Sequence, residues 1–296
     1  MNIIIAGATG YLGSRLVERL CSYPPPPDRH NILLILRDES RLSEILRDQR
    51  NVSICNINDE FLQNRIREFS PDIVFCTTCC YETDPEYLYK TVDANYVFPA
   101  QILQIAATLG TKLVRFISIG TSLPSSLNLY SLTKKHFAEL GVFFQQAGRI
   151  EFINLHLESF YGINEPKNRF VTRSVLQLKF NQDLLLTEGT QRRDYIFIDD
   201  VIEVLYFLLD CKKIALLADS GYNIPVGTGI APSIKEIILF LSEEIHSQSK
   251  LKFGAIEMRK NEPSTKADLS ILRKLGFSRS LTFWQDGMRQ VIGSIK

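Results

Sequence analysis

Residues 2–20 read NIIIAGATGYLGSRLVERL and place three glycines, Gly7, Gly10 and Gly13, between an apolar run and an amphipathic stretch. Glycines at such a junction let the backbone turn tightly and approach a pyrophosphate, whose charge is stabilised at the N-terminus of the following helix. The strand before the loop and the helix after it distinguish the pattern from an ordinary strand-to-helix turn. The residues predicted to contact a dinucleotide cofactor are Gly7, Thr9, Gly10, Tyr11 and Leu12.

Short apolar runs continue to alternate with amphipathic stretches along the first half of the chain. We expect strands at residues 2–6, 32–36, 52–55, 72–76, 113–119 and 152–157. We expect helices at residues 14–21, 39–47, 60–69, 97–109 and 130–146. Strands and helices that alternate in this way form a parallel sheet with helices on both faces. The sequence therefore predicts an α/β fold with a doubly wound parallel sheet, whose ligand lies beyond the carboxyl ends of the strands.

The pattern changes after Tyr161, where Gly, Pro and Asn gather in GINEPKN and a glycine-rich turn follows at Pro225–Gly229. We expect residues 165–193 and 228–296 to form a smaller C-terminal lobe that binds the substrate. Residues 1–164, with returning segments near 194–227, would form the cofactor-binding domain. The four prolines at 24–27 can join neither a helix nor a sheet ladder, so they predict an extended surface loop, with a proline-motif ligand as the alternative.

The composition of the 296-residue chain allows a substantial core, because 45% of the residues are hydrophobic and 23% are charged. The 34 basic and 33 acidic residues give a net charge of +1, so no general positive field favours nucleic acid or an anionic membrane. The N-terminal apolar run lacks basic residues before it and is too short for a signal peptide or a membrane span. We therefore expect a cytoplasmic protein.

The six cysteines include the run CTTCC, from Cys76 to Cys80, which contains a C-x-x-C spacing. Such a spacing could belong to a redox or zinc pair, but neither a second pair nor a histidine cluster accompanies it. We expect buried, reduced thiols at the end of a strand and no metal site.

The end of the second expected strand distinguishes the two nicotinamide cofactors, because an acidic residue there accepts from a ribose 2′-hydroxyl and repels a 2′-phosphate. In LLILRDES, Leu36 fills the acid position and Arg37 follows it. A guanidinium can bind a phosphate through two hydrogen bonds. The sequence therefore predicts that Arg37 selects NADP(H). The alternative is a solvated Arg37, and the neighbouring Asp38 leaves that alternative open.

The sequence LYSLTKKHF places Tyr130 and Lys134 four residues apart, on one face of the expected helix. A phenol ordinarily ionises near pH ~10, so proton transfer near neutrality needs a nearby cation. Lys134 would supply that cation and bind the nicotinamide ribose, and Tyr130 is also expected to contact the cofactor. Because the pair follows a fifth strand at the distance that a catalytic helix requires, both residues are predicted to be catalytic. Thr121, just past that strand, would orient the substrate oxygen, with Ser118 and Ser122 as competitors.

Three motifs together resemble the extended short-chain dehydrogenases/reductases, the family of nucleotide-sugar epimerases, dehydratases and reductases. The motifs are GATGYLG at residues 7–13, the Tyr130/Lys134 pair after a Ser/Thr, and RRDYIFIDDV at residues 192–201. The resemblance covers nearly the whole chain. It implies a Rossmann domain that binds the cofactor and a C-terminal lobe that binds a nucleotide sugar.

The same resemblance implies further site residues. Those implied beside the cofactor are Asn56 and Ile57 at the adenine, Thr78, Cys79, Cys80 and Tyr81 at the phosphates and sugar, and Ser159, Phe160 and Tyr161 at the nicotinamide. Those implied to bind the substrate are Tyr81, Ser122, Ser159, and the arginines Arg193 and Arg259 at its diphosphate. Asn95 matches the family's structural asparagine. His156 stands where the family often has an arginine.

Four segments are similar to one branch of this family, the CDP-paratose and CDP-abequose synthases, which reduce a 4-keto sugar with NADPH. The segments are residues 120–139, 155–162, 191–201 and 253–262. The similarity implies NADPH-dependent reduction of the C4 ketone of a nucleotide-linked 4-keto-6-deoxyhexose, in particular a CDP-3,6-dideoxyhexose. The product would be a deoxysugar nucleotide for O-antigen, other surface polysaccharide or glycoside synthesis.

The residues after Thr121 argue against other reactions of the family. A 4,6-dehydratase has an Asp-Glu pair directly after its threonine, whereas Ser122, Leu123 and Pro124 cannot exchange protons in that way. An epimerase/reductase of the GDP-fucose-synthase type has a cysteine near this position, and here none lies between residues 80 and 211.

Three alternatives stay open from the sequence: a nucleotide-sugar 4-epimerase, a reductase of a free small ketone, and a non-catalytic NADP-binding regulator. The expected partners are a nucleotide-sugar substrate and a second copy of the chain, through a four-helix bundle of residues 97–109 and 138–146. Neither nucleic acid nor a membrane is expected as a partner.

Overall fold

The computed structural model describes residues 1–22, 30–39, 49–81, 85–110, 112–259 and 262–295. The chain forms two compact units, one of Met1–His156 with Val204–Ile224 and one of Leu157–Glu203 with Pro225–Lys296. The proline loop at 24–27 and nearly all of the helix expected at 39–47 lie outside the described residues. The functions expected of the two domains stay predictions.

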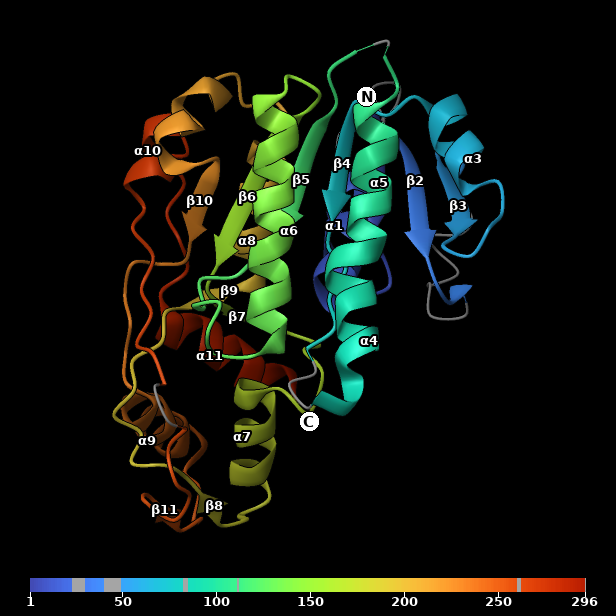
Figure 1. Ribbon diagram of the computed structural model, residues 1–296. Helices are drawn as coiled ribbons and strands as arrows, with labels where there is room; N and C mark the ends of the chain where they lie inside the picture. The colour runs from blue at the N-terminus through green and yellow to red at the C-terminus, as the bar shows by residue number, and fades with distance from the viewer. Residues whose placement is uncertain (23–29, 40–48, 82–84, 111, 260–261, 296) are drawn as a thin grey trace. The chain divides into compact units, whose positions relative to one another are not determined.

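A seven-stranded parallel sheet forms the centre of the fold, in the order β3-β2-β1-β4-β5-β6-β10 (Figure 1). Its strands are β1 (Asn2–Ala6), β2 (Asn31–Leu36), β3 (Val52–Asn56), β4 (Ile73–Cys76), β5 (Arg115–Ile119), β6 (Glu151–Leu157) and β10 (Asn223–Val226). The first six lie where the sequence predicts them, and their order is that of doubly wound dinucleotide-binding sheets. The predicted fold class is confirmed. Strand β10, expected only as part of a returning segment, extends the sheet beside β6.

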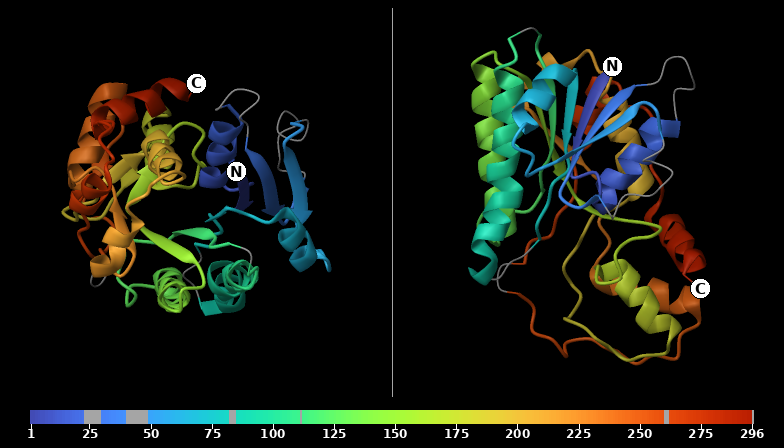
Figure 2. Two further views of the ribbon diagram at one scale, coloured as in Figure 1. Left: turned by 90° about the horizontal axis from the view of Figure 1, so that it is seen from above. Right: turned by 90° about the vertical axis from the view of Figure 1, so that its right-hand side faces the viewer.

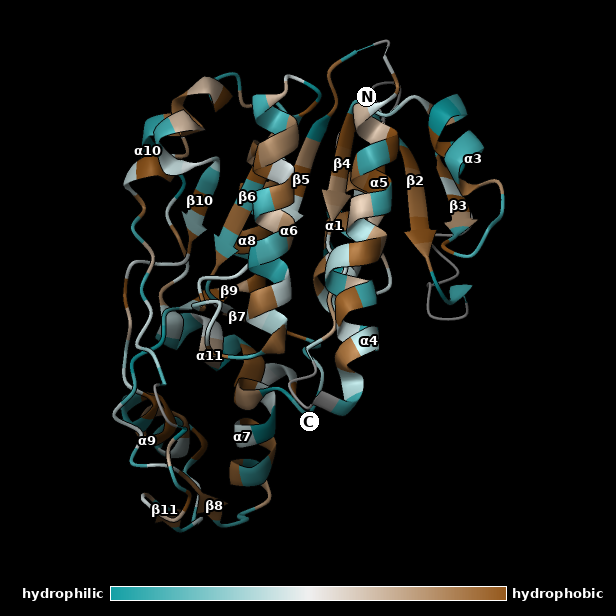
Figure 3. Cartoon of the chain, in the orientation of Figure 1, coloured by the Kyte–Doolittle hydropathy of each residue, from teal (hydrophilic) through white to brown (hydrophobic). Residues whose placement is uncertain are grey.

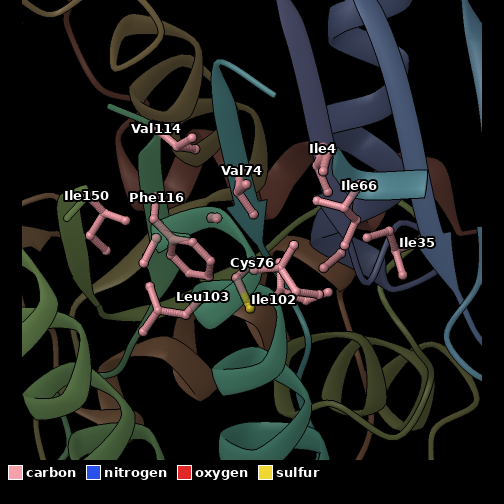
Figure 4. Close-up of a cluster of buried hydrophobic side chains, with 14 of the residues drawn as sticks. Ile4, Ile35, Ile66, Val74, Cys76, Ile102, Leu103, Val114, Phe116 and Ile150 are labelled. Carbon is pink, nitrogen blue, oxygen red and sulfur yellow. The ribbon is translucent and has the colours of Figure 1, made fainter. Parts of the chain in front are cut away.

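Helices cover both faces of the sheet in the first unit (Figure 2). They are α1 (Tyr11–Ser22), α3 (Leu62–Phe69), α5 (Phe98–Ala107) and α6 (Leu129–Gln146). On the face of α3, α5 and α6, alternate strand residues such as Ile4, Val74 and Phe116 pack against Ile102 (Figure 4). The strands read as continuous apolar runs because residues that point to either face are buried, and β2 and β4 are accordingly hydrophobic along their length (Figure 3).

The helix expected at 97–109 begins earlier than predicted. A continuous helical segment runs through α4 (Leu88–Val92), the π-helical turn η3 (Asp93–Val97) and α5. Pro99 lies in the first turn of α5, and proline has no N–H to donate to the carbonyl four residues before it. The expected helix start at residue 97 lies two residues before this proline. The structure instead accommodates Pro99 next to a wider turn, of the kind often found at functional sites.

The second unit has its own core and two small parallel sheets. Its strands are β7 (Ser159–Tyr161), paired with β9 (Tyr195–Phe197), and β8 (Leu184–Leu185), paired with β11 (Leu251–Lys252). Its helices are α7 (Phe170–Lys179), α9 (Ile234–Ile245), α10 (Ser270–Leu275) and α11 (Trp284–Ser294). The remaining elements are α8 (Ile198–Phe207), which spans the boundary between the units, and the short helices η2 (Pro85–Tyr87) and η4 (Ile214–Ser220). No helix in the described part of the chain is long and apolar enough to cross a membrane.

Tyr161 is a core residue of the second unit. It is fully buried, and its hydroxyl donates to the Trp284 carbonyl oxygen at 2.8 Å. A Cβ on Gly287 would lie only 2.2 Å from that hydroxyl, so the contact requires glycine. The expectation that the Tyr161 side chain lines the nicotinamide is therefore wrong, because the phenol is used to pack β7 against α11.

Candidate active site

The glycine loop after β1 is closed tightly against the end of β4. Gly7 has a φ of +89°, and a Cβ there would lie 2.9 Å from both Thr77 Oγ1 and the Thr78 nitrogen. A Cβ on Gly13 would lie 2.2 Å from the Gly7 carbonyl oxygen. Both positions therefore require glycine. The loop leads into α1 at Tyr11, so it presents the positive end of the helix dipole to an anion, as the sequence predicts for a cofactor pyrophosphate.

Arg37 lies at the carboxyl end of β2 with its side chain exposed. One guanidinium nitrogen is 3.9 Å from the Asp93 carboxylate, and both side chains are more than half exposed. An exposed ion pair at this distance stabilises little, so the guanidinium can exchange Asp93 for another anion. The neighbouring Asn56 donates to the Arg37 carbonyl oxygen at 3.2 Å, and the Ile57 N–H donates to that of Leu36 at 3.0 Å. These contacts place the two predicted adenine residues beside Arg37.

Helix α6 presents Tyr130 and Lys134 one turn apart. Asn128 caps the helix, since its side chain accepts from the Ser131 N–H at 2.8 Å. Lys134 is 4% exposed, and its ammonium group donates to the Thr78 carbonyl oxygen at 2.7 Å. The Tyr130 ring contacts the Tyr81 ring, with 4.6 Å between the two centroids. The structure thus brings four of the predicted site residues together in the first unit.

Asn95 joins this segment to the catalytic helix. Its fully buried side chain accepts from the Cys80 N–H at 2.8 Å and donates to the Cys80 carbonyl oxygen at 2.9 Å. It also donates to Thr133 Oγ1 on α6 at 3.2 Å. The π turn η3 contains Asn95, so the irregularity in the helix lies where the backbone of Cys80 is bound. Thr133 was not found from the sequence, because a threonine inside a helix gives no sign of such a contact.

Replacing Asn95 with alanine is expected to destabilise the protein, because it leaves two buried backbone groups of Cys80 without partners. Each unsatisfied group costs about 1–3 kcal/mol. Urea unfolding would measure the loss against Asn64→Ala, an exposed asparagine on α3 whose replacement should change the free energy of unfolding by at most about 0.5 kcal/mol. Equal stabilities of the two variants would contradict the structural role.

Thr121 is buried just beyond the end of β5. Its hydroxyl accepts from the Leu123 N–H at 3.2 Å. The backbone at the end of β5 lies close to the Asn154 side chain on β6, since a Cβ on Gly120 would lie 2.5 Å from Asn154 Oδ1. The competitor Ser118 is buried within β5, whereas Ser122 is partly exposed in the loop. The catalytic role of Thr121 and the substrate contact of Ser122 stay predictions.

Neither Cys76 nor His156 adds a charge to the site. All six cysteines are free thiols, and burial raises the pKa of Cys76 above its ordinary value. Among the described residues, no group of histidine, cysteine, aspartate or glutamate could hold a metal ion. Burial and the nearby Lys135, whose Nζ lies 3.3 Å from the imidazole Nε2, lower the pKa of His156 to about 4. His156 is therefore neutral at physiological pH and does not replace the charge of an arginine.

In the second unit, Arg193 is connected to the turn that carries Arg259. Arg193 is 7% exposed, forms an ion pair with Glu262 and donates to the Pro263 carbonyl oxygen. The Glu262 N–H in turn donates to the Arg259 carbonyl oxygen at 3.2 Å, and the Arg259 side chain is exposed. Sequence reasoning missed Glu262, which lies 69 residues from its partner.

Asp194, beside Arg193, organises the glycine-rich turn of the same unit. Its fully buried carboxylate accepts from the Thr228 N–H and hydroxyl, the Gly229 N–H and the Ala267 N–H, at 2.6 to 3.1 Å. A Cβ on Gly227 would lie 2.5 Å from this carboxylate. The role of Asp194 was not predicted from the sequence, although the residue lies in RRDYIFIDDV and binds the PVGTG turn.

Ser159 and Phe160 form part of β7. The Arg169 guanidinium lies 4.2 Å from the centre of the Phe160 ring and donates to the Phe160 carbonyl oxygen at 2.7 Å. Glu165 pairs with Arg169 at 2.9 Å. These contacts give Phe160 a defined orientation within its unit. The expected contacts of Ser159 and Phe160 with cofactor and substrate stay predictions.

Comparison with known proteins adds a family and a set of relatives. A family model described as the NAD dependent epimerase/dehydratase family matches residues 3–217. CDP-abequose synthase of Salmonella typhimurium is 29% identical over 88% of this chain and 87% of its own, and that of Salmonella muenchen is 26% identical over 98% and 97%. UDP-glucuronic acid 4-epimerase from Bacillus cereus, solved with UDP-glucuronic acid and NAD, has a TM-score of 0.84 at 21% identity and covers 100% of this chain and 99% of its own. At that identity the structural match shows the fold alone.

Proposed function

Because this chain belongs to the NAD dependent epimerase/dehydratase family, we propose that it reduces the C4 ketone of a nucleotide-linked 4-keto-6-deoxyhexose with NADPH. The observation that carries the proposal is the Tyr130–Lys134 pair on α6, with Lys134 anchored to Thr78 behind the glycine loop. The similarity to two CDP-abequose synthases favours a CDP-linked 3,6-dideoxyhexose among the sugars of this class.

The glycine loop fits a nicotinamide dinucleotide, because its tight turn needs glycine at Gly7 and Gly13 and leaves the backbone free of side chains there. A Cβ at either position would collide with neighbouring atoms of the loop or of the residues after β4. When bound, NADPH supplies the hydride. Tyr130 then donates its proton to the oxygen on C4, and the ammonium group of Lys134 stabilises the phenolate that remains. Thr121 positions that oxygen through its hydroxyl. Ketone reduction requires no further acid or base, which agrees with Ser122, Leu123 and Pro124 after Thr121.

Arg37 is proposed to select NADPH over NADH through the 2′-phosphate. Replacing Arg37 with alanine is expected to raise the Michaelis constant for NADPH by about 10-fold to 100-fold, the effect of losing charge-assisted hydrogen bonds, and to leave that for NADH unchanged. Initial rates with each cofactor would measure this, with the exposed Arg67→Ala variant on α3 as the control. Equal effects on both cofactors would refute the assignment.

The substrate diphosphate is proposed to bind Arg193 and Arg259, which Glu262 connects within the second unit. Guanidinium groups suit a diphosphate because they form paired hydrogen bonds with its oxygens. A thermal-shift comparison of CDP, UDP, GDP and dTDP tests whether the protein recognises a nucleotide. Stabilisation by CDP above the others supports the proposal, whereas no shift with any of them favours a reductase of a free small ketone.

A 4-epimerase is the second candidate, because the family whose model matches this chain includes epimerases. Such an enzyme returns the hydride to the sugar and consumes no cofactor over a complete turnover. A reductase, in contrast, should oxidise one equivalent of NADPH for each CDP-4-keto-3,6-dideoxyhexose that it reduces. The loss of NADPH absorbance would measure this ratio. Interconversion of a nucleotide-linked 4-hydroxy hexose with its C4 epimer, without net NADPH oxidation, would replace the reductase with the epimerase.

The cytoplasmic location and the homodimer expected from the sequence are part of the same proposal. A dimer would pair α5 and α6 with their copies in a four-helix bundle. Val97, at the start of the α5 region, and Phe143 on α6 are exposed apolar side chains that such a bundle could cover.

A further inference from the structure

Residues 77–81, which follow β4, are anchored to helix α6 at two points. Lys134 donates to the Thr78 carbonyl oxygen at 2.7 Å, and Asn95 binds both backbone groups of Cys80 while it donates to Thr133 on α6. The contacts of Asn95 are buried and that of Lys134 is partly buried, so water competes little for them. The backbone that leads into Tyr81 is therefore fixed relative to the proposed catalytic residues.

Tyr81 places an aromatic ring directly against the Tyr130 ring. The two ring planes are inclined at 52°, with 4.6 Å between the centroids, an arrangement within the range of attractive aromatic pairs. Tyr81 is nevertheless 55% exposed, so much of its surface remains open to a ligand. Tyr89 in α4, at 87%, is an exposed tyrosine for which the structure gives no such contact with Tyr130.

We propose that Tyr81 determines specificity by selecting sugars that lack a hydroxyl on a carbon next to the reacting ketone. The inference rests on the proposed function, because a ketone bound to the Tyr130 hydroxyl brings its neighbouring carbons next to the rings that border Tyr130. A hydroxyl pressed against an aromatic ring loses its hydrogen bonds to water without replacement, whereas a methylene group gains an apolar contact. An apolar wall can disfavour an added hydroxyl by at most about 100-fold.

The test compares two substrates that differ in one hydroxyl, CDP-4-keto-3,6-dideoxyglucose and CDP-4-keto-6-deoxyglucose. The unmodified protein should favour the 3-deoxy sugar by about 10-fold to 100-fold in kcat/KM. Tyr81→Phe keeps the ring and should keep the preference. Tyr81→Ser should lower kcat/KM for the 3-deoxy sugar far more than for the hydroxylated one, because the apolar contact with the ring is worth about tenfold or more. The ratio of kcat/KM between the two sugars should then fall below about threefold.

Two further variants separate specificity from folding. Tyr89→Ser removes an exposed tyrosine elsewhere and should leave the ratio unchanged. Tyr81→Leu keeps an apolar side chain and should retain part of the preference. If Tyr81→Ser leaves the ratio of kcat/KM between the two sugars unchanged, whether or not both values fall, the inference is overturned. If the unmodified protein reduces both sugars equally well, only the inference fails; if it reduces neither, the proposed function fails and the inference with it.

Discussion

Replacement of Tyr130 with phenylalanine is expected to lower kcat for keto-sugar reduction by about 100-fold to 10,000-fold, the usual contribution of a positioned general acid. Phenylalanine retains the ring that packs against Tyr81 and removes only the proton donor. Binding of NADPH should change little, because the variant retains the Tyr130 ring and leaves the proposed glycine-loop contacts untouched. Stopped-flow measurement of NADPH oxidation at saturating sugar would give kcat directly.

Tyr89→Phe is the matched control for this prediction, since it removes a phenol hydroxyl from an exposed helical position. It should retain the activity of the unmodified protein. A Tyr130→Phe variant that reduced the sugar as fast as Tyr89→Phe would remove the phenol from the mechanism, and with it the reason to regard α6 as the catalytic helix.

Replacement of Lys134 with methionine is expected to lower kcat by about 100-fold or more and to weaken NADPH binding by about 10-fold to 100-fold. Methionine approximates the length and apolar volume of the lysine stem but carries no charge. At 4% exposure the ammonium group acts in a medium where charge interactions are poorly screened, so its loss affects both the phenolate and the predicted ribose contact. Single-turnover rates and a fluorescence titration with NADPH would separate the two effects.

Lys135→Met provides the control, because Lys135 is the next residue of the same helix and lies beside His156 instead of Thr78. It should leave both kcat and NADPH affinity within about twofold, as expected for a change away from the site. Similar losses in the two variants would show that the helix tolerates no such substitution, and the specific role of Lys134 would be contradicted.

The sheet was predictable from the sequence because its strands are buried on both faces. Runs such as residues 2–6 and 32–36 are apolar without alternation, which is typical of parallel strands covered by helices. The short strands β7, β9 and β10 were not predicted individually, since three or four residues carry too little pattern and their pairing depends on distant segments. The π turn η3 was also not predicted from the sequence.

Spacing accounts for the parts of the site geometry that could be predicted from the sequence. The positions of Gly7 and Gly13 follow from a local motif, and those of Tyr130 and Lys134 from one helical turn. Partners that are distant in sequence could not be derived in this way. Glu262 reaches Arg193 across 69 residues, and Asp194 binds Thr228 and Ala267 across 34 and 73. Such contacts depend on how the second unit folds, which no local pattern reveals.

Transfer of a labelled hydride tests the central claim most directly. The protein would be incubated with CDP-4-keto-3,6-dideoxyglucose and NADPH that carries deuterium at both C4 positions of the nicotinamide, and the product would be examined by NMR. We predict one deuterium on C4 of the sugar, in a single configuration, with one equivalent of NADP⁺ formed. An unchanged keto sugar, or a product without deuterium at C4, would contradict the reductase account.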